Sequence, residues 1–155
     1  MEKEKYTKVC EALNETLDEF NQYLSIENKI PSVETNTFFQ LEDKCWIGSN
    51  QINLGEVGYS GVYIIVGENL QSHDINLYIG KASLSTIGKR LNSHLGKSYS
   101  NDKQCFIWEH LNCQLYRVYT INLSHLAFMS SALEEFMIDK MQEKFTLVNG
   151  TGNYA

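Results

Sequence analysis

The stretch GVYIIVG, residues 61–67, and the stretch INLYIG, residues 75–80, decide the fold of this chain. β-Branched and aromatic residues dominate both runs and glycines mark their ends, a pattern typical of β-strands. The residues from Glu68 to Asn76 that connect the runs are mostly polar, which predicts a hairpin-type connection. We therefore expect two neighbouring strands in the middle of the chain.

After the second strand, the spacing of apolar residues changes to that of a helix. In the segment 84–97, leucine and isoleucine recur at three- and four-residue steps, at Leu84, Ile87, Leu91 and Leu95. The later segments predict a short helix over 101–111, a third strand over 114–123 and a long helix over 124–145.

A further amphipathic pattern occupies the start of the chain. Apolar residues recur at helical steps over residues 3–25, and Pro31, in a polar connector, ends this helix. Residues 36–55 hold only short apolar pieces that predict no definite element. The chain thus divides into an N-terminal helical extension, 1–59, and a domain, 60–155. The order of elements predicts an α/β protein of the α+β type, with a small three-stranded mixed or antiparallel sheet flanked by helices.

Composition excludes several classes of protein. With 155 residues, 43% of them hydrophobic and 12% aromatic, the chain is long enough and apolar enough to form one globular core. No apolar run approaches the roughly 20 residues that span a bilayer, and the start lacks the apolar centre of a secretory signal, so we expect no membrane partner. The cysteines lie far apart without a C-x-x-C pair, which favours reduced thiols in a cytoplasmic protein over zinc or disulfides: Cys10, Cys45, Cys105 and Cys113.

Charge is distributed unevenly along the chain. The net charge is −6, and residues 1–60 carry eleven acidic residues against five lysines. The window 81–103 has the opposite balance, with one acidic residue and five bases: Lys81, Lys89, Arg90, Lys97 and Lys103. A local cationic patch of this kind can contact a phosphate backbone even on an acidic protein. A solvated basic helix face is the alternative, and charge alone does not separate the two.

Several short motifs occur in a definite order between residues 61 and 149. The chain carries two aromatic–glycine triplets on adjacent predicted strands, then two helical residues, a glutamate and an asparagine: Gly61-Val62-Tyr63, Tyr78-Ile79-Gly80, Arg90, His94, Glu134 and Asn149. Over about residues 60–150 this set resembles the GIY-YIG nuclease family, with Val62 a conservative replacement for the family's isoleucine. The resemblance implies that residues 60–155 form a nuclease domain in which Tyr63, Tyr78, Arg90 and Glu134 converge on one face of the sheet.

The resemblance also implies roles for the residues that match. Phosphodiester hydrolysis needs an activated nucleophile and stabilisation of charge on the phosphoryl and leaving oxygens. Tyr63 is then the candidate general base, Tyr78 a supporting tyrosine that orients water or phosphate, and Arg90 the clamp on the transition state. Strand tyrosines are commonly structural, which is the alternative for both tyrosines.

Three more residues take roles from the resemblance. Lys81 directly follows the YIG triplet, where restriction-enzyme members of the family have a lysine that helps to activate the nucleophile. His94 lies one helical turn after Arg90 and is implied as a phosphate contact or proton-transfer partner, while Lys97 extends the same polar stripe. Asn149 matches an asparagine whose amide helps to hold the site. The alternative for Lys81 is an exposed surface lysine, and for His94 and Lys97 it is a solvated basic helix face. For Asn149 the alternative is an Asn-Gly turn.

Glu134 stands out from its position alone. At about 100° per residue, it points into the middle of the apolar arc of the last predicted helix, formed by Leu133, Met137, Ile138, Met141 and Phe145. The other polar residues of this helix point away from the arc: Glu135, Asp139, Gln142 and Glu143. An inward carboxylate is costly unless it is paired, capped or bound to a metal ion.

Two interpretations of Glu134 compete. It could ligate Mg²⁺ or Mn²⁺, with waters and substrate phosphate oxygens completing the coordination, because a single carboxylate holds such an ion poorly. It could instead close a capping box with Ser131, if the helix begins there. The order of the motifs favours the metal ligand, and Glu135 is the fallback if the helical register differs.

The resulting expectation is a divalent-metal-dependent DNA endonuclease of restriction or phage-defence type. YIGKA followed by R-L-x-x-H, and the tail NGTGN, are similar to a restriction-endonuclease subgroup of the family. An inactive GIY-YIG-fold module that binds DNA or protein is the alternative. The N-terminal helix could pack on its own domain, which is the simpler expectation, or form a homodimer arm suited to a palindromic site.

Overall fold

Three long antiparallel strands form the centre of the molecule. A computed structural model of the chain describes residues 2–34, 37–42, 45–48 and 53–149. In it, β3 (Gly61–Asn69) lies between β4 (Ile75–Ala82) and β7 (Cys113–Asn122). β3 and β4 form an antiparallel hairpin, and the pairing continues from Gly61 opposite Ala82 to Glu68 opposite Ile75. The expected hairpin and the expected third strand are therefore confirmed.

The sheet is larger than predicted. Short strands extend it on both sides in the order β2-β1-β7-β3-β4-β8, and β5 joins through β6, which also pairs with β7. These added strands are β1 (Phe39–Glu42), β2 (Cys45–Gly48), β5 (Tyr99–Ser100), β6 (Cys105–Trp108) and β8 (Thr146–Leu147). The α+β class is confirmed, but the expectation of three strands is wrong. Strands of two to four residues are too short to display a clear two-residue alternation.

The short helix predicted over 101–111 is also wrong. β5 and β6 form a small antiparallel hairpin there, and only Glu109–Leu111 are helical, as the 3-10 turn η3. Gln104 and Asn112 adopt positive φ angles of 55° and 50°, which a continuous helix does not allow. The run CFIW, whose last three residues are buried, is the strand signal in this segment.

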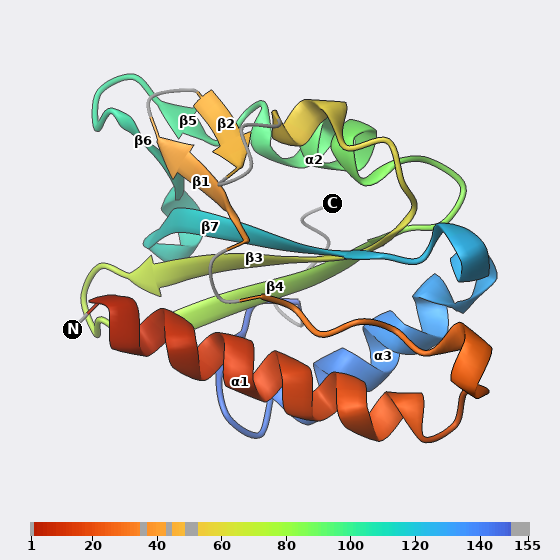
Figure 1. Cartoon of the computed structure of the whole chain (residues 1–155). Coiled ribbons are helices and arrows are strands. Elements are labelled where there is room, and N and C mark those ends of the chain that lie inside the picture. Colours follow the sequence, from red (N-terminus) through yellow and green to blue (C-terminus); the bar gives the residue numbers. More distant parts are fainter. Residues whose placement is uncertain (1, 35–36, 43–44, 49–52, 150–155) are drawn as a thin grey trace.

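Helices cover both faces of the central strands. Figure 1 shows α1 (Glu2–Asn21) and α3 (Ser130–Met141) on one side and α2 (Ile87–Leu95) on the other. Because successive strand residues point to opposite faces, β3 contributes to two cores. Val62, Ile64 and Val66 pack with α1 and α3, while Tyr63 and Ile65 pack with α2. The short elements η2 (Leu54–Glu56), β1 and β6 add apolar residues to the α2 side.

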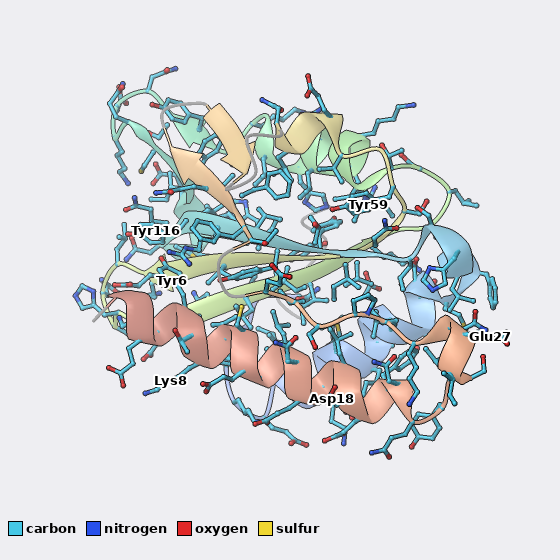
Figure 2. The ribbon with its side chains drawn as sticks, viewed as in Figure 1. Tyr6, Lys8, Asp18, Glu27, Tyr59 and Tyr116 are labelled. Carbon is cyan, nitrogen blue, oxygen red and sulfur yellow. The ribbon has the colours of Figure 1, made fainter. Side chains whose placement is uncertain are left out.

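Helix α1 is part of the domain core. Leu13 and Leu17 are buried in the same cluster as the strands and α3. Near the N-terminus of α1, the Arg117 guanidinium of β7 lies 3.8 Å from the ring centroids of both Tyr6 and Phe38. Figure 2 shows Tyr6 between α1 and the sheet. The helix therefore packs on its own domain, and the boundary predicted at residues 59 and 60 falls inside a shared core.

Three helix boundaries differ from those predicted. α1 ends at Asn21 and is followed by the 3-10 helix η1 (Ile26–Asn28), not by a helix reaching residue 25. α2 begins at Ile87, after an N-cap at Thr86 whose hydroxyl accepts a hydrogen bond from the Lys89 amide. The long helix over 124–145 is divided, because η4 (Ser124–Met129) has a non-helical residue and α3 begins only at Ser130.

Two expectations from composition can be compared with this fold. Cys10, Cys105 and Cys113 are unpaired thiols, and the side chain of Cys45 lies outside the described residues. Within the described ranges, no helix combines the length and the apolar character needed to cross a membrane.

Candidate functional site

A cavity of about 370 Å³ lies beside the edge of β4, and the main predicted site residues meet there. Side chains from the two central strands and from both helix layers line it: Tyr63, Tyr78, Lys81, Arg90 and Glu134. The loop between β4 and α2 completes the wall with Ser83, Leu84 and Ser85. Five of the seven predicted catalytic residues are therefore neighbours in space.

The residues reach the cavity from two sides of the sheet. On β4, Tyr78 packs on the α2 side, and the alternation of strand side chains directs Lys81 to the α3 side. Its Nζ donates a hydrogen bond of 2.5 Å to Ser131 Oγ on α3. β8 pairs with β4 only at Asn76 and Leu77, so it does not extend along the strand as far as Lys81. The site thus wraps around this edge. The expectation that its residues converge on one face of the sheet is wrong.

Close contacts explain why glycine occupies positions 61 and 80 in the two triplets. Tyr63 lies directly opposite Gly80 in the β3–β4 ladder. A Cβ atom on Gly80 would lie 2.4 Å from the Tyr63 ring and hydroxyl. Gly61 has a φ of 155°, and a Cβ there would lie 1.8 Å from the Ile121 carbonyl oxygen on β7. The first triplet's tyrosine and the second triplet's glycine are therefore cross-strand partners, and Gly80 leaves the space that the Tyr63 ring occupies.

Tyr63 is fully buried. Its hydroxyl makes no hydrogen bond within normal limits to any described residue, although the Arg90 guanidinium is near enough to act on it. Burial raises the pKa of Tyr63 well above its usual value, and the neighbouring Tyr78 adds to the rise, while the charge of Arg90 opposes it. This environment favours a protonated tyrosine, which is the opposite of what a resting general base requires.

Tyr78 and His94 form an aromatic group with Tyr63. The His94 ring centroid lies 5.2 Å from that of Tyr78 and 6.0 Å from that of Tyr63, and Trp108 packs edge-on against Tyr78 at 5.7 Å. Burial raises the pKa of Tyr78 as well. Burial, together with the Arg90 charge, lowers the pKa of His94 to about 4. His94 is therefore a neutral imidazole at physiological pH and lies behind the two tyrosines, not in the cavity wall.

Glu134 is half-buried in the cavity wall and lacks a partner. Among the described residues it forms no hydrogen bond and no salt bridge within 4.0 Å, in contrast to Glu15, Glu19, Glu68 and Glu109. Burial raises the pKa of the Glu134 carboxyl, and the Lys81 charge is the largest opposing influence. A carboxylate in this state is receptive to a cation.

The capping-box alternative is not realised. The N-cap of α3 is Met129, no side chain caps the helix, and the Ser131 hydroxyl is engaged by Lys81. The orientation predicted for the helix is confirmed, because the residues expected on its solvent face are exposed: Glu135, Asp139, Gln142 and Glu143.

Asn149 contacts the backbone beneath the site. Its Oδ1 accepts a hydrogen bond of 3.0 Å from the Ile79 amide, and its Nδ2 donates one of 2.6 Å to the Ile79 carbonyl. The Val148 amide also donates to the Leu77 carbonyl, at 3.0 Å. Asn149 thus continues the pairing of β8 and fixes β4 between Tyr78 and Gly80.

The other predicted phosphate contacts do not line the cavity. Lys89 and Lys97 are exposed, and Lys97 lies beyond the C-cap Gly96, so the polar stripe on α2 ends at His94. Lys103 forms a 2.8 Å salt bridge with Glu109. The five bases of the window 81–103 are therefore not one uninterrupted patch, and Lys81 and Arg90 are the two that reach the cavity.

The donor set can supply part of a metal site. No cluster of three or more histidine, cysteine, aspartate or glutamate side chains occurs among the residues that the structure describes. Glu134 fits one position of an oxygen-rich shell, since it is accessible from the cavity and unpaired. Waters and phosphate oxygens would have to occupy the others, as is common for Mg²⁺.

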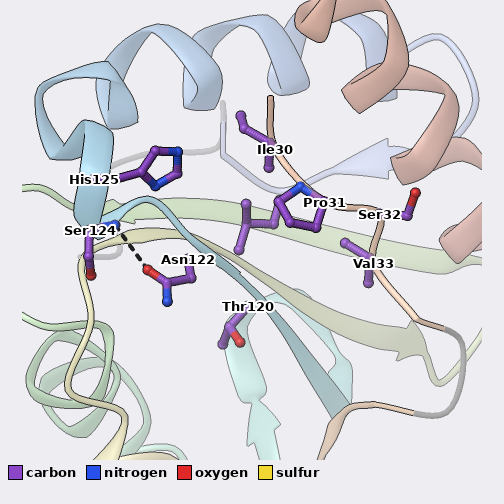
Figure 3. Close-up of a pocket in the computed structure, with 9 residues that line it drawn as sticks. Ile30, Pro31, Ser32, Val33, Thr120, Asn122, Ser124 and His125 are labelled. Carbon is purple, nitrogen blue, oxygen red and sulfur yellow. Dashed lines mark hydrogen bonds between the residues drawn. The ribbon is translucent and has the colours of Figure 1, made fainter. Parts of the chain in front are cut away.

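A second cavity of about 440 Å³ lies between the connector after α1 and the end of β7 (Figure 3). Its lining includes Pro31, Val33 and Thr120, and His125 is the one titratable side chain among the described lining residues. The Ser124 amide donates to Asn122 Oδ1 at its rim. It is larger than the cavity beside β4 but lacks grouped charges, so its size does not make it the site.

Two parts of the site were not foreseen from the sequence. The sequence suggests only a helix-capping role for Ser131, although in the structure it is the hydrogen-bond partner of Lys81. The helical spacing predicts Leu84 on the apolar face of a helix, but it is fully exposed on the loop that lines the cavity. The sequence signal for a later helix start is Thr86, a favoured N-cap residue directly before Ile87.

Comparison with known proteins adds no relative. No protein-family model matches the sequence, and neither curated proteins nor solved structures gave a match. The assignment of a function therefore depends on the motifs and on the geometry of the cavity.

Proposed function

We propose that the chain is a divalent-metal-dependent endonuclease that hydrolyses phosphodiester bonds in DNA, of restriction or phage-defence type. The observation that carries the proposal is the meeting of Tyr63, Tyr78, Lys81, Arg90 and Glu134 around one cavity. Two cations and an unpaired carboxylate beside two tyrosines are the groups that attack on a phosphodiester requires. The ordered resemblance to GIY-YIG nucleases supports the same reaction.

The chain's residues would divide the work as follows. Arg90 donates hydrogen bonds to the phosphoryl oxygens and stabilises the charge that builds on them, and Lys81 adds a second positive charge. Glu134 would hold Mg²⁺ or Mn²⁺, which when bound would polarise the phosphate and make water more acidic. Water attacks phosphorus while the bond to the leaving oxygen breaks. The attacking water gives up one proton to a base or to solvent, and the leaving oxygen takes up one proton from solvent.

The tyrosines need a more specific role than the resemblance implies. With its pKa raised by burial, Tyr63 is a hydrogen-bond donor in the resting site. A cation approaching Glu134 would favour the tyrosinate form and is the condition under which Tyr63 could take a proton from water. Tyr78 is only half-buried and is the tyrosine better placed to orient water or phosphate.

The decisive experiment is incubation of the purified protein with plasmid DNA and Mg²⁺ or Mn²⁺, followed by sequencing of the ends. We expect nicking or defined fragments that disappear with a chelator. Glu134→Gln and Arg90→Ala should lower cleavage by at least about a hundredfold, the usual effect of losing a group that stabilises the transition state. Circular dichroism should show that both variants retain the fold.

Glu135→Gln is the matched control. Glu135 is the neighbouring carboxylate, but it is exposed and does not line the cavity, so this variant should cleave like the wild type. Full activity in Glu134→Gln, or loss of activity only in Glu135→Gln, contradicts the assignment. No cleavage of modified or unmodified DNA, of RNA or of branched DNA would favour the alternative of an inactive binding module.

A further inference from the structure

The hydrogen bond between Lys81 and Ser131 is not explained by the reaction steps above. Lys81 Nζ, at the end of β4, lies 2.5 Å from Ser131 Oγ in the first turn of α3. Glu134 follows Ser131 by three residues, so the two side chains lie on neighbouring positions of one helix face. A single lysine thus contacts a hydroxyl and shares the cavity with a carboxylate that lies about one turn further along the same helix.

We propose that Ser131 is a positioning residue that holds Lys81 away from the Glu134 carboxylate and so keeps that carboxylate open to a divalent cation. This inference rests on the proposed function, because it assumes that Glu134 is the metal ligand. In this proposal Ser131 does not cap the helix but accepts a hydrogen bond from Lys81, which fixes the position of the Lys81 ammonium group before a substrate binds.

The charges make such a restraint necessary. An ammonium and a carboxylate that share one partly buried cavity attract each other more strongly than they would in water. The Lys81 side chain has a flexible four-carbon stem and could swing to either partner. Lys81 and Glu134 nevertheless form no salt bridge within 4.0 Å among the described residues, although the Lys81 charge acts on Glu134. The Ser131 hydroxyl is the acceptor that holds Nζ instead.

A hydroxyl suits this purpose better than a charged acceptor. It accepts a hydrogen bond from the ammonium group without neutralising it, so Lys81 keeps its charge and two further N–H donors for a phosphate. A direct Lys81–Glu134 pair would instead occupy the oxygens that the metal ion needs. The serine therefore allows a cationic residue and a metal-binding carboxylate to share the cavity.

The neighbouring serine provides a matched control. Ser130 is fully buried, and its Oγ has no hydrogen-bond partner among the residues that the structure describes. It is adjacent to Ser131 and has the same side chain, but the hydrogen bond from Lys81 goes to Ser131 and not to Ser130. Ser130→Ala therefore tests the general effect of removing a hydroxyl from the start of α3.

The test measures Mn²⁺ binding to the full-length protein by electron paramagnetic resonance, with a phosphorothioate DNA duplex that resists cleavage. We expect Ser131→Ala to weaken Mn²⁺ binding by about tenfold, the lower end for residues that support a metal ligand. Ser131→Thr, which keeps the hydroxyl, and Ser130→Ala should bind like the wild type. Adding Lys81→Met to Ser131→Ala should restore binding, because the competing cation is gone. Unchanged binding in Ser131→Ala, or no recovery in the double variant, overturns the proposal.

A crystal structure of Ser131→Ala separates this inference from the proposed function. We expect Lys81 Nζ to move within about 4 Å of the Glu134 carboxylate, the usual limit for an ion pair. If the wild type cleaves DNA but Nζ keeps its place in the variant, the inference fails and the nuclease assignment stands. If the wild type cleaves no nucleic acid while Nζ moves as expected, the nuclease assignment fails and the positioning role of Ser131 is retained.

Discussion

At the level of single residues, the site gathers groups whose charged forms are disfavoured by burial and places cations beside them. Burial raises the pKa values of Tyr63, Tyr78 and Glu134, and the Arg90 charge opposes the rise in all three. Lys81 acts on Glu134 in the same direction. Such opposed influences within one cavity are typical of functional sites, because an arriving cation or phosphate then changes the protonation balance.

His94 gives a prediction about acid stability. Its pKa is 6.5 in an unfolded chain and about 4 in the folded protein. The unfolded state therefore binds the proton first, so the stabilising effect is complete above pH 6.5 and is lost as the pH falls towards 4. We expect the free energy of unfolding to fall by roughly 3 kcal/mol across this window because of His94. Urea titrations at pH 7 and pH 4 measure the change.

The comparison with His94→Gln isolates the imidazole. Other groups titrate over the same range, and Glu134, whose folded pKa is raised, contributes with the opposite sign because its neutral form is favoured in the fold. These contributions are common to both proteins and cancel in the difference. Equal acid sensitivity in the wild type and His94→Gln would show that His94 is not held neutral by its surroundings.

At the level of elements, the length of each helix or strand determined whether its sequence pattern could predict it. β3 and β4 have nine and eight residues and each contains a run rich in β-branched and aromatic side chains, so the sequence alone identified both strands and their pairing. β8 has two residues and pairs in parallel with β4, a contact between positions about seventy residues apart. No local pattern encodes such an edge strand, because its stability comes from the strand that it joins.

The same limit explains the mixed outcome for the site. The inward direction of Glu134 follows from helical geometry and could be predicted, since α3 is long enough to have a buried and an exposed face. The contact between Lys81 and Ser131 joins a strand end to a helix start, fifty positions apart. Only the packing of α3 against β4 creates that contact, so the sequence pattern contained no sign of it.

The start of α2 gives a prediction at the same scale. Leu84 and Leu91 have identical side chains and were both expected on the apolar face of one helix, but Leu84 is fully exposed and Leu91 is fully buried. Leu91→Ala should lower the free energy of unfolding by about 2–5 kcal/mol through the cavity it leaves. Leu84→Ala should change it by less than about 0.5 kcal/mol. Chemical denaturation of the two variants decides whether α2 begins before or after Leu84.

At the level of the whole molecule, the acidic N-terminal helix completes the fold and also forms ion pairs with lysines from the C-terminal part of the chain. The apolar face of α1 closes the core over β3, β4 and α3. On its outer face, Glu15 and Glu19 pair with Lys144 and Lys140, which lie after and within α3. The acidic first third is therefore tied to the opposite end of the chain, while the cationic residues of the cavity lie at the edge of β4.

This arrangement predicts that α1 and the central strands unfold together. Leu13 is fully buried between α1 and the sheet, whereas Glu11 on the same helix is exposed. Leu13→Ala should destabilise the protein by about 2–5 kcal/mol and accelerate amide hydrogen exchange in β3 and β7 as well as in α1, because cooperative units open as a whole. Glu11→Ala should leave exchange unchanged in all three elements. Faster exchange confined to α1 in Leu13→Ala would instead identify the helix as a separable arm, and the residues from 60 onward would then have to form a core of their own.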